Sequence, residues 1–168
     1  WRNRSGESIS TTWIIVFQFM FASFVVYGVE KNSLALIIQG CVRVPLVSII
    51  LLGLWKFKGF TNRQMAIFII LFGGIIYMPF SNHKAFIFLL YSYLGVASAM
   101  LQTWELWKTK HTGVVSIKFL MLNFIGVFLW VIYGSIVLDD PAVQIMGLSY
   151  CANYSVTIAL WFKYRKNA

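Results

Sequence analysis

The sequence predicts an all-α membrane protein made of two parallel repeats. Its composition, its long apolar stretches and an internal duplication lead to this prediction. Of the 168 residues, 60% are hydrophobic and only 11% are charged. A soluble domain carries roughly 25% charged residues, so this chain has too few to cover a surface that faces water. We therefore expect lipid to contact much of that surface.

Six stretches are long enough to cross the hydrocarbon core of a bilayer, which takes roughly 20 helical residues. They are continuously apolar and do not alternate every second residue, which argues against the strands of a membrane barrel. Backbone polar groups in lipid must be satisfied within the protein, and helices achieve this. The predicted helices cover residues 11–29, 34–55, 64–80, 85–106, 116–137 and 141–162.

The first three predicted helices have recognisable ends. The first follows Ser10, a residue type that caps helices, and closes with Tyr27-Gly28. Tyrosine anchors a helix at the membrane interface and glycine commonly terminates it. The second ends at Trp55, another interface anchor, and the third is the shortest and ends at Pro79. These signals place the helix boundaries near the membrane surfaces.

The last three predicted helices show the same signals. The fourth runs into the basic residue Lys108, and the fifth follows Ser116 and closes with Tyr133-Gly134. The sixth ends at Trp161 and is followed by cations. Basic and aromatic residues at helix ends are typical of membrane boundaries.

The sequence is also duplicated internally. Residues 1–55 recur as residues 107–161, and we expect a constant spacing of about 106 residues throughout, as in repeat architectures. The aligned pairs include Arg2 with Lys108, Arg4 with Lys110, Ser10 with Ser116, Val25 with Val131, and Tyr27-Gly28 with Tyr133-Gly134. Duplicated apolar units are typical of membrane carriers whose substrate site lies between the repeats.

The distribution of cations predicts the orientation. If the N-terminal loop is cytoplasmic and the helices alternate, eleven cations lie inside and two outside, which is a strong positive-inside bias. The inside set is Arg2, Arg4, Lys56, Lys58, Arg63, Lys108, Lys110, Lys118, Lys163, Arg165 and Lys166, and the outside set is Lys31 and Lys84. Both ends of the sequence, including the C-terminus, are thus predicted to be cytoplasmic.

The duplication also predicts the domain plan. The second copy is preceded by the helix at 85–106, whereas the first copy has no helix before it. We therefore expect two three-helix repeats joined by a linker helix, with the first helix missing and six helices visible. The corresponding ranges are 1–62 for the first repeat, 63–83 for the linker and 84–168 for the second repeat.

These residues resemble the PQ-loop superfamily, and most closely the SWEET and SemiSWEET sugar transporters. The family pattern is Pro-Gln, then Lys-Thr-Lys-Ser, Glu-Gly-Ile-Ser, an apolar helix and Tyr-Gly. The second copy matches it with Leu101-Gln102, Lys108-Thr109-Lys110, Ser116, Trp130 and Tyr133-Gly134. The first copy matches it with Arg2-Asn3-Arg4-Ser5, Glu7-Ser8-Ile9-Ser10 and Tyr27-Gly28. The resemblance implies a gating role for Gln102, although Leu101 replaces the family's proline.

The resemblance further implies a substrate site at mid-membrane. The aromatic position of each repeat falls on Phe24 and Trp130, and ordinary core packing is the alternative for both. The family's asparagine position falls on Gly40 and Met146, or on Gln39 if the first repeat shifts by one residue. Asn153 and Asn123 are further candidates, because polar side chains in a span either line a cavity or join helices.

Arg43 lies near the middle of the second predicted helix. An arginine there costs at least roughly 2.5–3.5 kcal/mol on insertion scales, and its counterpart in the second copy is expected to be Ser149. Arg43 is therefore a candidate for binding an anionic group in a wet cavity. The alternatives are snorkelling, or an ion pair with Glu105 or with the lost first helix.

Taken together, these features predict a facilitative carrier of a small polar solute, with a sugar implied by the resemblance. Alternatives are a carrier of an amino acid, another anion or a nucleoside, and a membrane receptor or assembly subunit that transports nothing. No catalytic or metal-binding set is evident, so we expect no enzyme activity, cofactor or metal. The expected partners are a solute and the lipid bilayer, and no nucleic acid. Whether the chain forms a homo-oligomer stays an open question. Cys41 and Cys151 lie in apolar stretches and are predicted to be packing residues.

Overall fold

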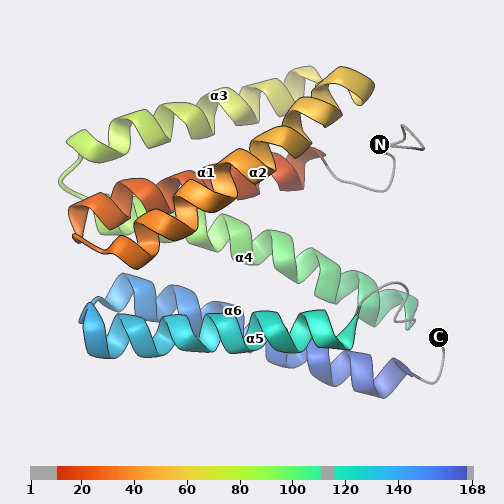
Figure 1. Ribbon diagram of the computed structural model, residues 1–168. Coiled ribbons are helices and arrows are strands. Elements are labelled where there is room, and N and C mark those ends of the chain that lie inside the picture. The colour runs from red at the N-terminus through yellow and green to blue at the C-terminus, as the bar shows by residue number, and fades with distance from the viewer. Residues whose placement is uncertain (1–10, 111–115, 166–168) are drawn as a thin grey trace. The chain divides into compact units, whose positions relative to one another are not determined.

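The six predicted helices are confirmed in the computed structural model, which describes residues 11–110 and 116–165 (Figure 1). No strand occurs within those two ranges. In chain order the helices are α1 (Thr11–Glu30), α2 (Leu34–Lys58), α3 (Asn62–Tyr77), α4 (Lys84–Thr109), α5 (Ile117–Ile132) and α6 (Pro141–Tyr164). A 3₁₀ turn, η1 (Met78–Phe80), extends α3, and a π-helical turn, η2 (Tyr133–Val137), extends α5.

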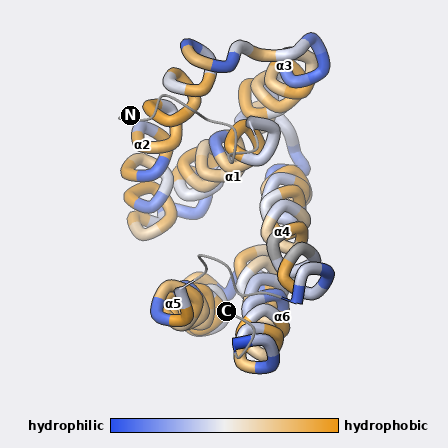
Figure 2. The backbone as a smooth tube through the Cα atoms, turned by 90° about the vertical axis from the view of Figure 1, so that its right-hand side faces the viewer, coloured by the Kyte–Doolittle hydropathy of each residue, from blue (hydrophilic) through white to orange (hydrophobic). Residues whose placement is uncertain are grey.

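All six helices, counted with their extensions, are long and apolar enough to cross a membrane. Hydrophobic residues run along each of them (Figure 2). The chain is therefore a multi-pass membrane protein, and many of its large apolar side chains are exposed because lipid takes the place of water.

Polar caps start several of these helices. The Ser33 hydroxyl accepts from the Leu36 amide at 3.3 Å at the start of α2. Thr61 and Gln64 form a reciprocal capping box at the start of α3. Ser116 occupies the cap position of α5 as predicted, but its side chain makes no capping hydrogen bond there. The predicted caps Ser5 and Ser10, with the basic residues before them, lie outside the described residues.

The chain divides into two compact units, Trp1–Leu94 and Gly95–Ala168. In the first unit α2 and α3 both pack against α1. Its apolar core contains Ile14, Ile15, Phe19, Leu51, Leu54 and Tyr91. In the second unit α5 and α6 form a hairpin, and the later part of α4 joins it through Thr103. The boundary thus falls inside α4, and the predicted ranges for repeats and linker stay a prediction.

Candidate functional site

Each unit contains a helical hairpin, α1–α2 in the first and α5–α6 in the second, and both are closed by a tyrosine-glycine pair. The expectation that Gly28 and Gly134 terminate their helices is wrong, since helical structure continues to Glu30 and to Val137. Gly28 instead permits close helix packing, because an added Cβ would lie 2.9 Å from Leu36 Cβ and from the Ile37 amide nitrogen. At Gly134 an added Cβ would lie 3.0 Å from the Gln144 amide nitrogen.

The two turns differ by one residue. In the first hairpin the Gly28 carbonyl accepts from the amide of Ser33, which caps α2, at 2.8 Å. In the second hairpin the Gly134 carbonyl accepts from the amide of Asp140, which caps α6, at 2.9 Å. The second turn therefore spans six residues where the first spans five. Its extra residue is accommodated in the π-helical turn, where the Leu138 amide donates to the Tyr133 carbonyl.

This insertion corrects the expected spacing beyond the turn from 106 to 107 residues. The residue that corresponds to Gly40 is Gly147 and not Met146. An added Cβ on Gly40 would overlap the Val25 side chain and lie 2.8 Å from the Phe21 carbonyl. An added Cβ on Gly147 would meet the aligned residues, Val131 and Val127. The same pair of glycine contacts thus occurs in both hairpins.

The corrected spacing reassigns the remaining site candidates. At a spacing of 107 residues, Gln39 corresponds to Met146. This is the one-residue shift that was considered for the first repeat. Arg43 pairs with Tyr150 and not with Ser149. Asn153 pairs with Leu46, and Thr157 with Ile50, so these two polar residues of α6 replace apolar ones of α2.

The two aromatic candidates lie in different surroundings. Phe24 is buried, and its ring centroid lies 5.3 Å from that of Phe88, which in turn stacks on Tyr27 at 4.4 Å. Trp130 is half-buried, and its ring meets that of Tyr133 edge-on at 5.5 Å. In the described structure the Trp130 ring is thus partly open, whereas Phe24 belongs to an aromatic stack.

A buried polar network joins α4 to α6 within the second unit. The Thr103 hydroxyl lies 3.0 Å from the Asn153 side-chain oxygen and 2.6 Å from the Thr157 hydroxyl. The Thr157 hydroxyl also donates to the backbone carbonyl of Asn153, one turn earlier on α6, at 2.8 Å. Sequence reasoning identified Asn153 but missed both threonines. The spacing of Thr157 one turn after Asn153 is the signal that could have revealed it.

The other polar candidates are more dispersed. Gln39 is half-buried on α2. The Asn123 amide donates to the Phe119 carbonyl of its own helix at 2.8 Å. Gln102 lies in α4, and its side chain falls outside what the structure describes. Residues 11–110 and 116–165 contain no cluster of three or more His, Cys, Asp or Glu that could hold a metal ion.

Arg43 is exposed on α2, and its guanidinium carbon lies 4.8 Å from the centre of the Phe21 ring. This geometry is a cation–π contact. No ion pair between Arg43 and a carboxylate occurs among the described side chains.

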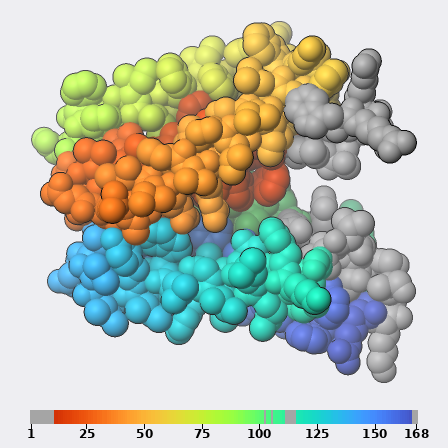
Figure 3. Space-filling view, in the orientation of Figure 1, coloured from red at the N-terminus to blue at the C-terminus, as the bar shows by residue number. Residues whose placement is uncertain are grey.

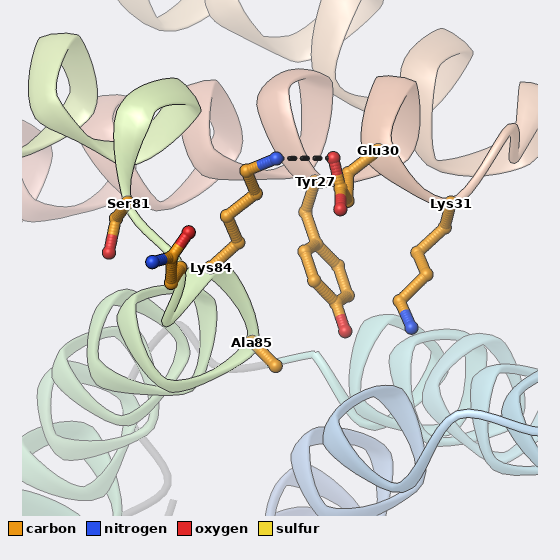
Figure 4. A pocket seen from close by; sticks show the side chains of 7 residues that line it. Tyr27, Glu30, Lys31, Ser81, Lys84 and Ala85 are labelled. Carbon is orange, nitrogen blue, oxygen red and sulfur yellow. Dashed lines mark hydrogen bonds and ion pairs between the residues drawn. The ribbon is translucent and has the colours of Figure 1, made fainter.

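A polar pocket of about 280 Å³ lies at the end of the first unit that carries the α1–α2 and α3–α4 turns (Figure 4). Lys84 reaches Glu30 there, with 2.6 Å between the ammonium nitrogen and a carboxylate oxygen. The Lys31 ammonium lies 5.6 Å from the centre of the Tyr27 ring. Ser81, Asn82 and Ala85 complete the lining. Sequence reasoning placed Lys31 and Lys84 on the same side of the membrane but did not predict this pocket.

Comparison with known proteins adds one match. No curated protein and no solved structure matches the chain. Residues 87–143 match the PQ loop repeat family. This segment contains most of α4, all of α5 and the turn into α6, and with them Leu101-Gln102 and Tyr133-Gly134. Over this segment, the chain is similar to PQ loop repeat proteins.

Proposed function

We propose that this protein is a facilitative membrane carrier of a small polar solute, most economically a sugar. Two repeats would expose a central site alternately to each side of the bilayer. The observation that carries the proposal is the PQ loop repeat match at 87–143, supported by the same glycine-packed hairpin in both units. The positive-inside bias places both ends of the sequence in the cytoplasm in this proposal.

The second unit supplies the groups best suited to hold a sugar. A sugar has apolar C–H faces that stack on an aromatic ring, and hydroxyls that need fixed donors and acceptors. The half-buried Trp130 ring suits the first requirement. Asn153 suits the second, because its side-chain oxygen accepts from the Thr103 hydroxyl and a membrane-embedded amide is costly unless it has partners.

The remaining assignments follow from the same proposal. We place five further residues beside the solute pathway and not in direct contact with the solute. They are Gln39, Gly40, Met146, Asn123 and Phe24. Gln102 is placed in the gating helix α4. With Leu101 in place of a proline, the flexibility of this helix would come from Gly95 or from the small residues 97–99.

Uptake by proteoliposomes tests the proposal. The purified chain is reconstituted, and uptake of labelled glucose is compared with uptake of labelled amino acids and nucleosides. We expect saturable glucose uptake that falls about tenfold or more in Trp130→Ala, since one stacked ring is lost from the site. Phe128→Ala is the matched control, because Phe128 is an exposed aromatic residue of the same helix. It should keep uptake close to that of the unchanged chain.

The outcomes separate the alternatives. Uptake of amino acids or nucleosides without glucose would keep the carrier and overturn the sugar assignment. Background uptake of every solute by correctly folded protein would contradict transport and favour a receptor or assembly role.

A further inference from the structure

The polar pocket at the α1–α2 and α3–α4 turns carries a positive charge. Its described lining residues all belong to the first unit. Among them Lys31 and Lys84 are cations and Glu30 is a carboxylate, so two positive charges and one negative charge give a net charge of +1. In the view of Figure 4 the two lysine side chains lie on either side of the Tyr27 ring. The pocket therefore favours an anion over a cation.

The start of α4 adds uncharged hydrogen-bond donors to this lining. The Ile87 amide donates to the His83 carbonyl at 3.0 Å and so begins the bonding pattern of the helix. The amides of Lys84 and Ala85 come before it and have no partner in that pattern. Both residues line the pocket. The positive end of the helix dipole lies there as well and stabilises negative charge.

Ser81 supplies a donor that is buried and has no acceptor. The residue is 4% exposed, and its hydroxyl oxygen accepts from the His83 amide at 3.0 Å. No described group accepts the proton of this hydroxyl. A buried donor without an acceptor is costly, so an acceptor that a ligand brings would be stabilised here. Asn82, which also lines the pocket, can donate through its amide.

The negative charge of the pocket is already engaged. The Glu30 carboxylate lies 2.6 Å from the Lys84 ammonium. An ammonium has three N–H donors, so Lys84 keeps donors for a ligand even while it bonds to Glu30. A ligand that is rich in acceptors fits this lining better than one that is rich in donors.

Size and position favour a phosphate group among the possible anions. The volume of about 280 Å³ is several times the roughly 30 Å³ share of a water molecule, so the pocket is too large for a halide ion. It lies where the span of α1 ends at Glu30, and lipid headgroups flank the hydrocarbon core at this level. A phosphate also offers several oxygens to lysine side chains and to the amides of a helix start.

We propose that this pocket binds the phosphate group of an anionic phosphate ester. Lys31, Lys84, the Ser81 hydroxyl and the first amides of α4 are the groups that bind it. The phosphate belongs either to a lipid headgroup or to a soluble ester, since both present the same oxygens. This site belongs to the first unit, whereas Trp130 and Asn153 belong to the second. The inference does not depend on which solute is carried.

Binding of two phosphate probes to the purified full chain in detergent tests the proposal. The probes are a fluorescent short-chain phosphatidylglycerol and glycerol 3-phosphate. Lys31→Gln combined with Lys84→Gln should weaken binding about tenfold, because two charged donors are lost. Lys56→Gln combined with Lys58→Gln is the matched control and should change the affinity by less than about twofold. These exposed lysines lie in the last turn of α2, at the other end of the first unit from the α1–α2 turn (Figure 3).

A third variant should change the affinity in the opposite direction. Glu30→Gln removes the negative charge and releases Lys84, so binding should tighten about threefold. A merely misfolded variant would not bind more tightly.

The two probes also identify the source of the phosphate. Phosphatidylglycerol that glycerol 3-phosphate cannot displace supports a lipid headgroup, whereas displacement supports a soluble ester. The proposal would be overturned by equal binding of phosphatidylcholine and phosphatidylglycerol, by equal losses in the two lysine pairs, or by no binding of either probe.

Discussion

The α1–α2 and α5–α6 hairpins are packed in the same way at one glycine contact between their helices, which we call the glycine seam. They differ in the length of their turns and in the residues that their second helices bury. Gly40 and Gly147 contact aligned residues of the preceding helix, whereas the turns contain different numbers of residues. Asn32 and Asp139 both adopt positive φ at the end of the turn, at 50° and 46°. Asparagine and aspartate tolerate this conformation better than most residues. The seam is therefore the common feature, and the turn accommodates a length difference without disturbing it.

The largest effect should come from breaking the register of the second hairpin. Deleting Ile125 from α5 would rotate the following residues by about 100°, because an α-helix has 3.6 residues per turn. Leu120 and Val127 would then no longer share a face, and we expect no folded hairpin. Deleting Ile136 from the π-helical turn should instead be tolerated, since it restores the shorter turn of the first hairpin. Size-exclusion profiles and thermal unfolding in detergent distinguish the two. Equal damage from both deletions would contradict the register assignment.

Filling the glycine seam should have the next largest effect. Gly40→Ala is expected to lower the free energy of unfolding by about 1–3 kcal/mol, since its Cβ would meet both the Val25 side chain and a carbonyl oxygen. Gly147→Ala should cost less, about 1 kcal/mol, because its nearest backbone atom is 3.1 Å away. Gly126→Ala is the control. Nothing lies within 4 Å of its added Cβ, so it should be neutral or stabilising by up to about 1 kcal/mol. Denaturant unfolding in micelles gives all three values.

The polar network allows α6, where Asn153 and Thr157 are buried, to be compared with the corresponding positions of α2. Thr103→Val removes the hydroxyl that joins α4 to Asn153 and Thr157, and should cost about 0.6–1.7 kcal/mol of unfolding free energy. Ile50→Thr places a hydroxyl at the matching position of α2, where Ile50 is exposed. It should change stability by less than about 0.5 kcal/mol in the isolated chain. A large cost for Ile50→Thr would contradict the exposure of this position.

The smallest effect is expected at the ion pair between Lys84 and Glu30 in the first unit. Glu30→Gln should cost at most about 0.5 kcal/mol, because both partners are partly exposed and water screens their attraction. The cost should shrink further as salt concentration rises. The reversed pair, Glu30→Lys with Lys84→Glu, should recover most of the loss. A cost that is independent of salt would indicate that the pair is shielded from water.

Most of the fold could be predicted from the sequence, whereas less of the site could. Continuous apolar length and boundary residues such as Trp55 and Ser116 are local properties, so the six helices were predictable to within a few residues. Asn153 was identifiable because an amide in an apolar span needs partners. Thr103 lies 50 residues earlier, and the rotation of α4 about its own axis decides whether the two meet.

The sequence by itself determined the membrane class, the helices and the existence of the duplication, because these depend on residues near one another in the chain. Only the tertiary structure decided that Gly147 and not Met146 corresponds to Gly40. One extra residue in a turn leaves both apolar patterns intact, and the contacts of the glycines with the preceding helix reveal the shift. The tertiary structure also decided that Phe24 is stacked and Arg43 exposed, since burial depends on which helices pack together.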